Sequence, residues 1–147
     1  MRLAQHIETH IHTGDAADTV TLDYEARFLR RKRLVSDAGE PFLVELAETQ
    51  SLNQGEGFRL DDGRIIAVMA AAEPLLAVRH GNLARIAWHV GNRHTPCQIA
   101  DDHILIREDK VLQAMLEGLG ASVTQVTAPF TPEGGAYGHG RTHGHEH

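Results

Sequence analysis

The sequence contains almost no cysteine, since Cys97 is the only one in 147 residues. An intrachain disulfide is therefore excluded, and so is a closed zinc site built on paired cysteines. The opening residues, "MRLAQHIETH", contain no apolar run of the kind that a secretory signal needs. Together these features predict a cytoplasmic protein.

Aromatic residues and long hydrophobic runs are also scarce. With four Phe, two Tyr and one Trp, each core must depend on Val, Leu, Ile and Ala. The longest apolar run, from Ile65 to Ala72, is far shorter than the roughly 20 residues of a membrane-spanning helix. The formal net charge of −6 argues against a general nucleic-acid binder. We therefore expect neither a membrane nor a nucleic acid as a partner.

The first half of the chain has the alternating pattern of β-strands. Apolar and polar residues alternate from Val20 to Ala26 and again from Phe42 to Leu46. Turn sequences, "DAGEP" and "DDG", separate the apolar runs. The pattern predicts a small all-β domain over residues 1–71.

The second half mixes strands with helices. The run "PLLAVRH" predicts a strand, and Asn82 then caps a helix that ends at Gly91. The apolar stripe of that helix consists of Leu83, Ile86, Ala87 and Val90. A second helix ends at Gly120, and its predicted buried face consists of Val111, Leu112, Met115, Leu116 and Leu119.

Two short strands in "CQIADDHILIRE" and a last strand in "ASVTQVT" complete the order β-α-β-β-α-β, which is that of the ferredoxin-like fold. We therefore predict the α+β class, with a ferredoxin-like domain over residues 72–132 after the all-β domain. Beyond Pro129 the chain is rich in Gly, Pro and His, so we expect disorder there. A flexible His-rich tail is assigned to residues 133–147.

A basic stretch, "RFLRRKR", stands out in this acidic chain. It contains Arg27, Arg30, Arg31, Lys32 and Arg33. One interpretation is an exposed edge strand whose charges prevent pairing with other chains. The other is a docking patch for an acidic partner.

The back of the first helix carries Trp88 and His89, away from its apolar stripe. Trp is enriched at protein interfaces, and two small domains gain stability from association. A dimer contact near this helix is therefore predicted.

The segment "WHVGNRHTPCQI" brings His89, His94 and Cys97 within nine positions. His94 follows the predicted helix end and precedes Pro96, so we expect its ring in an exposed loop. Either an ordinary surface histidine or a metal ligand fits this position. Cys97 begins a strand and is interpreted as a small buried apolar residue. A nucleophile pair of Cys97 with His94 or His89 is the enzymatic alternative, although no oxyanion hole or orienting acid accompanies it.

The tail is dense in histidine, at His139, His143, His145 and His147. Neutral imidazole binds Ni²⁺, Cu²⁺ and Zn²⁺, and the intervening glycines let several rings converge on one ion. A flexible tract of this kind suits a metal carrier or reservoir and does not suit a catalyst.

Three segments, "WHVGNRHTPCQI", "ILIREDKVLQAMLEGLGASV" and "APFTPEGGAYGHG", closely resemble the UreE family of urease accessory proteins, which are nickel metallochaperones. Two weaker segments, "TVTLDYEARFLRRKRL" and "LDDGRIIAV", are similar to the N-terminal domain of that family. The similarity extends over nearly the whole chain in the same order, and "GNRH" followed by "APF" and "GGAYGHG" is a specific combination.

The resemblance implies an N-terminal β domain that binds peptide and a C-terminal ferredoxin-like domain that dimerises and binds metal. It implies that His94 is the metal ligand at the dimer interface, with further ligands from the tail histidines. The implied cargo is Ni²⁺, while Zn²⁺ or Cu²⁺ fits the same ligands. The implied partners are the urease-associated GTPase of the UreG type and the urease apoprotein complex.

One position departs from the family pattern. Many members have a second histidine at the start of the last helix, where this chain has Lys110, so that site is not carried over. His103 lies nearby in the sequence but matches no motif. His6, His10 and His12 are interpreted as surface residues.

The leading hypothesis is a homodimeric nickel chaperone for urease, with no enzymatic activity. The metal ligands are His94 and the four tail histidines, with His89 as a weaker candidate. Alternatives are a small enzyme that uses His94 and Cys97, or a general His-rich metal-storage protein. An RNA-binding module of the RRM type would have the same β-α-β-β-α-β order. The aromatic-rich motif of those modules is absent from this sequence.

Overall fold

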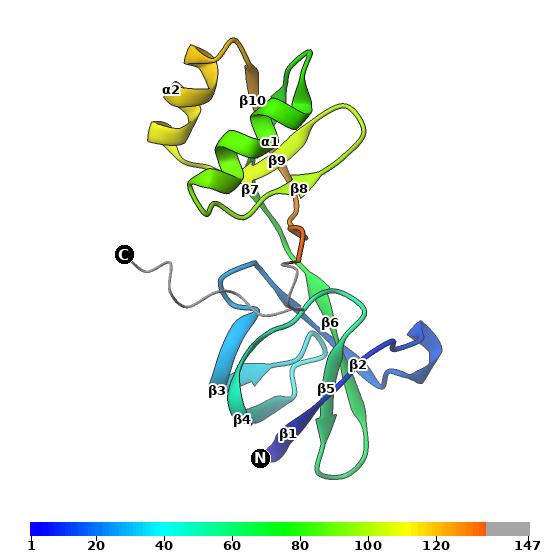
Figure 1. The fold of residues 1–147 in the computed structure, drawn as a ribbon. Coiled ribbons are helices and arrows are strands. Elements are labelled where there is room, and N and C mark those ends of the chain that lie inside the picture. Colours follow the sequence, from blue (N-terminus) through cyan, green and yellow to red (C-terminus); the bar gives the residue numbers. More distant parts are fainter. Residues whose placement is uncertain (135–147) are drawn as a thin grey trace. The chain divides into compact units, whose positions relative to one another are not determined.

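The chain forms two compact units in a computed structural model that describes residues 1–134. The first unit is Met1–Ala71 and the second is Ala72–Gly134 (Figure 1). The regular elements of the first unit are strands and one short 3-10 helix, whereas both α-helices belong to the second unit. The predicted α+β class is confirmed. No helix within residues 1–134 is long and apolar enough to cross a membrane.

The first unit is one sheet with the strand order β2-β6-β5-β1-β4-β3. Its elements are β1 (Arg2–Glu8), η1 (Thr13–Asp15), β2 (Asp18–Leu22), β3 (Phe28–Val35), β4 (Pro41–Ser51), β5 (Gly57–Leu60) and β6 (Ile65–Ala70). The alternation predicted from Phe42 to Leu46 is confirmed, because Phe42, Val44 and Leu46 are buried in β4. The alternation that starts at Val20 is shorter than predicted, since β2 ends at Leu22 and a turn follows.

The two ends of this sheet meet through the turn between β3 and β4. The backbone N–H of Asp37 donates to the carbonyl of Thr19 on β2, at 2.8 Å. The Asp37 carboxylate accepts hydrogen bonds from the hydroxyls of Thr19 and Thr21, at 2.6 and 2.8 Å. The sheet therefore curls around one apolar core, in which the rings of Phe42 and Phe58 lie 5.8 Å apart.

Arg27 corrects the interpretation of the basic stretch as uniformly exposed. Its side chain is only 1% exposed. Its guanidinium donates to the carbonyls of Leu52 and Leu22, at 3.0 and 3.1 Å, and lies 5.8 Å from the ring centre of Tyr24. A buried charge needs such partners because its desolvation is otherwise costly. Arg27 is therefore a structural residue that joins the turn before β3 to the end of β4.

The second unit has the predicted β-α-β-β-α-β order. Its elements are β7 (Ala72–Arg79), α1 (Leu83–Asn92), β8 (Gln98–Ile99), β9 (Ile104–Arg107), α2 (Lys110–Gly118) and β10 (Ser122–Pro129). The sheet order is β10-β7-β9-β8, with antiparallel neighbours throughout. Both helices pack on the sheet through a core that includes Ile86 and Val90 of α1 and Leu112 and Leu116 of α2 (Figure 1).

Both helices begin as capped segments. The side chain of Asn82 accepts a hydrogen bond from Arg85 N, as the predicted cap requires. Asp109 caps α2 by accepting from the N–H groups of Val111 and Leu112. The prediction that Val111 belongs to the buried face is wrong, because its side chain is 69% exposed. The buried face is centred on Leu112, and one residue along a helix corresponds to a rotation of about 100°.

Gly57 lies where no side chain fits. It is buried at the start of β5, and a Cβ added there would overlap the carbonyl oxygen of Ile66 and lie 2.7 Å from Cδ1 of Ile11. Because the Ile66 carbonyl is backbone, the strand itself would have to move. We expect Gly57→Ala to lower the free energy of unfolding of the first unit by about 1–3 kcal/mol. Urea denaturation monitored by circular dichroism measures this change.

Gly14→Ala is the matched control, because no atom lies within 4 Å of a Cβ at that position and its φ is not left-handed. That variant should unfold within about 0.5 kcal/mol of the parent chain. Equal stability of the two variants would contradict the packing argument.

Candidate metal centre

The end of helix α1 sets the position of His94. Arg93 is the C-cap, and His94 follows it with a φ of 57°, in the left-handed region. The N–H of His94 donates to the carbonyl of Gly91 at 3.0 Å, and the N–H of Thr95 donates to that of Val90 at 3.3 Å. These two bonds define a Schellman motif, in which the left-handed residue is usually glycine.

In this motif His94 takes the place of that glycine. A left-handed conformation costs a residue with a side chain about 1–2 kcal/mol relative to glycine. Gly91, which the sequence predicts to be the helix end, instead lies within α1 with space around it. The chain thus has a glycine three residues away, yet a histidine occupies the strained position. The side chain is exposed, as predicted for a loop.

Trp88 and His89 lie beside this helix end. Trp88 is 63% exposed, and its ring centre lies 5.0 Å from that of His89 in an edge-to-face arrangement. The prediction that both residues avoid the apolar stripe is confirmed for Trp88 by its exposure, while His89 is partly buried.

Cys97 is half-buried, three residues after His94, and packs against the core of the second unit. Burial, followed by the nearby charge of Glu133, raises the pKa of its thiol. The neutral thiol is therefore favoured at pH 7, and it is a poor nucleophile and a poor metal ligand. This chemistry does not favour the enzymatic alternative.

Residues 130–133 are ordered, which corrects the expected disorder beyond Pro129. The ring of Phe130 is fully buried. The N–H of Thr131 donates to the side-chain oxygen of Gln98 at 2.9 Å, and the N–H of Glu133 donates to the carbonyl of Cys97 at 2.8 Å. The last described part of the chain is thus attached beside β8, close in sequence to His94. The sequence signal for this order was the single apolar residue Phe130.

The tail histidines His139, His143, His145 and His147 lie outside the described residues. Within residues 1–134, no group of three or more His, Cys, Asp or Glu side chains converges as a metal site would require.

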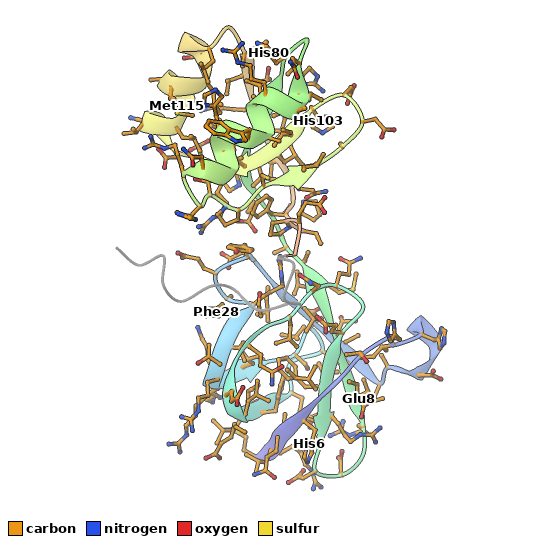
Figure 2. All side chains as sticks on the ribbon, viewed as in Figure 1. His6, Glu8, Phe28, His80, His103 and Met115 are labelled. Atoms are coloured by element: carbon orange, nitrogen blue, oxygen red, sulfur yellow. The ribbon has the colours of Figure 1, made fainter. Side chains whose placement is uncertain are left out.

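Other histidines serve local structure (Figure 2). His80 accepts from Asn82 N through Nδ1 at 2.9 Å, so its Nε2–H donates to the carbonyl of Leu119 at 3.2 Å and joins β7 to the end of α2. His103 pairs with Asp102 at 2.6 Å, and this hydrogen bond lowers the pKa of Asp102. Sequence reasoning missed the role of His80, because its partner lies 39 residues away. His6, His10 and His12 are exposed, as predicted.

Comparisons with known proteins agree along the whole chain. Residues 2–71 match the family model described as the UreE urease accessory protein, N-terminal domain, and residues 73–147 match its C-terminal domain. The chain is 57% identical to a urease accessory protein UreE of Ruegeria pomeroyi, over 92% of this chain and 91% of that protein. It is 61% identical to a UreE of Rhodobacter capsulatus, over 90% and 84% of the two chains.

The strain at His94 is directly testable. We expect His94→Gly to raise the free energy of unfolding of the metal-free chain by roughly 0.5–1 kcal/mol, because glycine adopts the left-handed conformation without penalty but loses more entropy on folding. Urea denaturation in the presence of a chelator measures this difference. His94→Val should be destabilising, because a β-branched residue fits the left-handed region poorly. A loss of stability in His94→Gly would show that the histidine is kept for packing.

Proposed function

Because the chain belongs to the UreE family of urease accessory proteins, which take part in urease maturation, we propose that it is a nickel-binding metallochaperone. In this proposal it carries Ni²⁺ for assembly of the urease active site, acts as a homodimer, and catalyses no reaction itself.

The geometry of His94 is the observation that carries this proposal. A strained residue that persists where glycine would fit marks a position kept for its side chain. The two Schellman hydrogen bonds hold the backbone at His94, so the imidazole projects from a hydrogen-bonded helix end and not from an unconstrained loop. A rigid, exposed imidazole is a suitable first ligand for a divalent metal ion.

The homodimer in this proposal is supported by the shortage of converging ligands within residues 1–134 of one chain. A metal ion on a two-fold axis meets the same residue twice, so one His94 from each protomer gives two ligands. The exposed Trp88, on the same helix, supplies an aromatic surface of the kind enriched at protein interfaces. His89 is the weaker ligand candidate, since it is helix-borne, partly buried and in contact with Trp88.

We assign further ligands to the tail. Glu133 is held to Cys97, and His139 follows six residues later, which corresponds to at most about 20 Å of extended chain. The tail histidines therefore start close enough to reach the His94 loop. Several exchanging imidazoles suit a carrier, because the ion has to be passed on to a partner.

Nickel is the assigned cargo because urease maturation is the family's role, while Zn²⁺ or Cu²⁺ fits the same imidazole set. The receiving partners in this proposal are the urease-associated GTPase and the urease apoprotein complex. Lys110, and not a histidine, is exposed at the first position of α2, so no second site is assigned there.

The central test replaces His94 in a chain that ends at Tyr137, so that the tail histidines do not contribute. We expect His94→Ala to remove the tightest nickel site of this truncated dimer, as measured by isothermal titration calorimetry. Added nickel should also stop stabilising the dimer, because the linkage disappears with the ligand. Analytical ultracentrifugation with and without nickel measures that effect.

Two matched variants make this result specific. Cys97→Ala should leave nickel binding unchanged, because the protonated thiol takes no part. His89→Ala should have a smaller effect than His94→Ala. Equal losses from His89→Ala and His94→Ala would indicate a site within one protomer, and the symmetric arrangement would have to be abandoned.

Tail truncation separates capacity from affinity. Ending the full chain at Tyr137 removes four histidines and none of the residues in the two cores. We expect fewer nickel ions per dimer, while the temperature of thermal unfolding and the dimerisation remain unchanged. Equilibrium dialysis with metal analysis counts the ions. An unchanged ion count would contradict the tail's assignment as a source of ligands.

A further inference from the structure

The outer edge of β3 carries a run of cations that the proposed nickel binding does not use. Four consecutive residues, Arg30 to Arg33, are exposed in a chain whose net charge is −6. β3 is the last strand of its sheet and pairs with β4 alone among the strands of residues 1–134 (Figure 1). This segment, here called the basic edge, thus combines an unpaired strand edge with a local excess of positive charge.

The register explains why all four side chains reach solvent. Arg31 lies opposite Glu45 and Arg33 opposite Leu43, on the outer face of the sheet. Lys32 lies opposite the buried Val44, on the other face of the strand, and is nevertheless exposed. At Arg30 the pairing register shifts, because β4 has extra residues between Glu45 and Gln50. The basic edge therefore presents cations on both faces of one strand.

Very little within the first unit neutralises this charge. Arg31 lies 3.9 Å from Glu45, and both side chains are largely in water. Arg30 donates through Nε to the carbonyl of Ala47 at 3.4 Å, which is a neutral acceptor. Exposed pairs of this kind are weak and remain free to exchange for a better partner.

The opposite end of the sheet is arranged differently. There, Asp37 covers β2 with its backbone N–H and its carboxylate. Charged residues on an open edge are a known protection against aggregation. Like charges on two copies of the basic edge would repel each other, while an acidic strand would be attracted. The same residues therefore exclude self-pairing and select for one type of partner.

We propose that the basic edge binds an acidic, extended segment of a partner protein, which adds to the sheet as a strand beside β3. Successive residues on one face of a strand are about 7 Å apart, so carboxylates at alternate positions of the added strand match Arg31 and Arg33. Arginine forms paired hydrogen bonds with a carboxylate, which adds to the backbone ladder. An extended protein segment fits this linear arrangement better than a nucleic acid does, since the chain as a whole is acidic.

The test uses the full chain without metal and a fluorescent twelve-residue peptide of alternating Glu and Thr. We expect saturable binding by fluorescence anisotropy, which weakens as salt is raised. The double variant Arg31→Glu/Arg33→Glu should reduce the affinity at least about tenfold. The neutral variant Arg31→Gln/Arg33→Gln should give an intermediate loss of peptide affinity. It replaces the charge-reversal variant in the test if charge reversal disturbs folding. Nickel binding should be the same in all of these variants, so this result is separate from the proposed function.

Two controls isolate the surface and the mode of binding. Arg85→Glu/Lys110→Glu makes the same change in net charge on the second unit and should leave the peptide affinity unchanged. Methylation of alternate peptide nitrogens keeps the charge but removes backbone donors, and it should abolish binding.

Four results would overturn the proposal. They are an unchanged affinity after charge reversal on β3, an equal loss in the control variant, full binding of the methylated peptide, or tighter binding of a single-stranded RNA of equal length at the same ionic strength.

Discussion

The second unit is organised around the way in which helix α1 ends. The stripe centred on Ile86 and Val90 packs on the sheet, and the helix must stop once that stripe leaves the core. The chain closes the helix with two backbone hydrogen bonds and one left-handed residue, His94. The direction of the following loop depends on this turn, as does the place where β8 joins the sheet. Residues 131–133 are hydrogen-bonded beside β8, so the turn at His94 also influences where this last described segment attaches.

Each unit solves the stability problem of a small domain without disulfides. The first unit curls one sheet until its ends meet at Asp37 and Thr19, which encloses a core of aliphatic residues and two Phe rings. The second unit covers its sheet with two capped helices. The buried guanidinium of Arg27 is satisfied inside the first unit, because it donates to the backbone carbonyls of Leu22 and Leu52. The chemistry for binding partners can therefore lie on surfaces and strained turns rather than in the cores.

Charge is distributed so that the two units are suited to different tasks. The first unit concentrates cations on the free edge of β3, whereas the second presents imidazole at the end of α1. The two features thus belong to different units of the chain, so each can be altered without changing the residues of the other.

The sequence by itself determined the class and order of elements, because these depend on local periodicity and on caps such as Asn82. It also identified His94 as the candidate ligand, since its position after a helix and its family resemblance are both properties of neighbouring residues. Only the tertiary structure revealed that Arg27 is buried, that Val111 is exposed, and that Phe130 is packed. Only the structure placed the left-handed turn at His94 instead of Gly91, and it linked His80 to Leu119 across 39 residues. These outcomes depend on contacts between segments far apart in the chain, and the pattern within one segment carries no information about the segment it will meet.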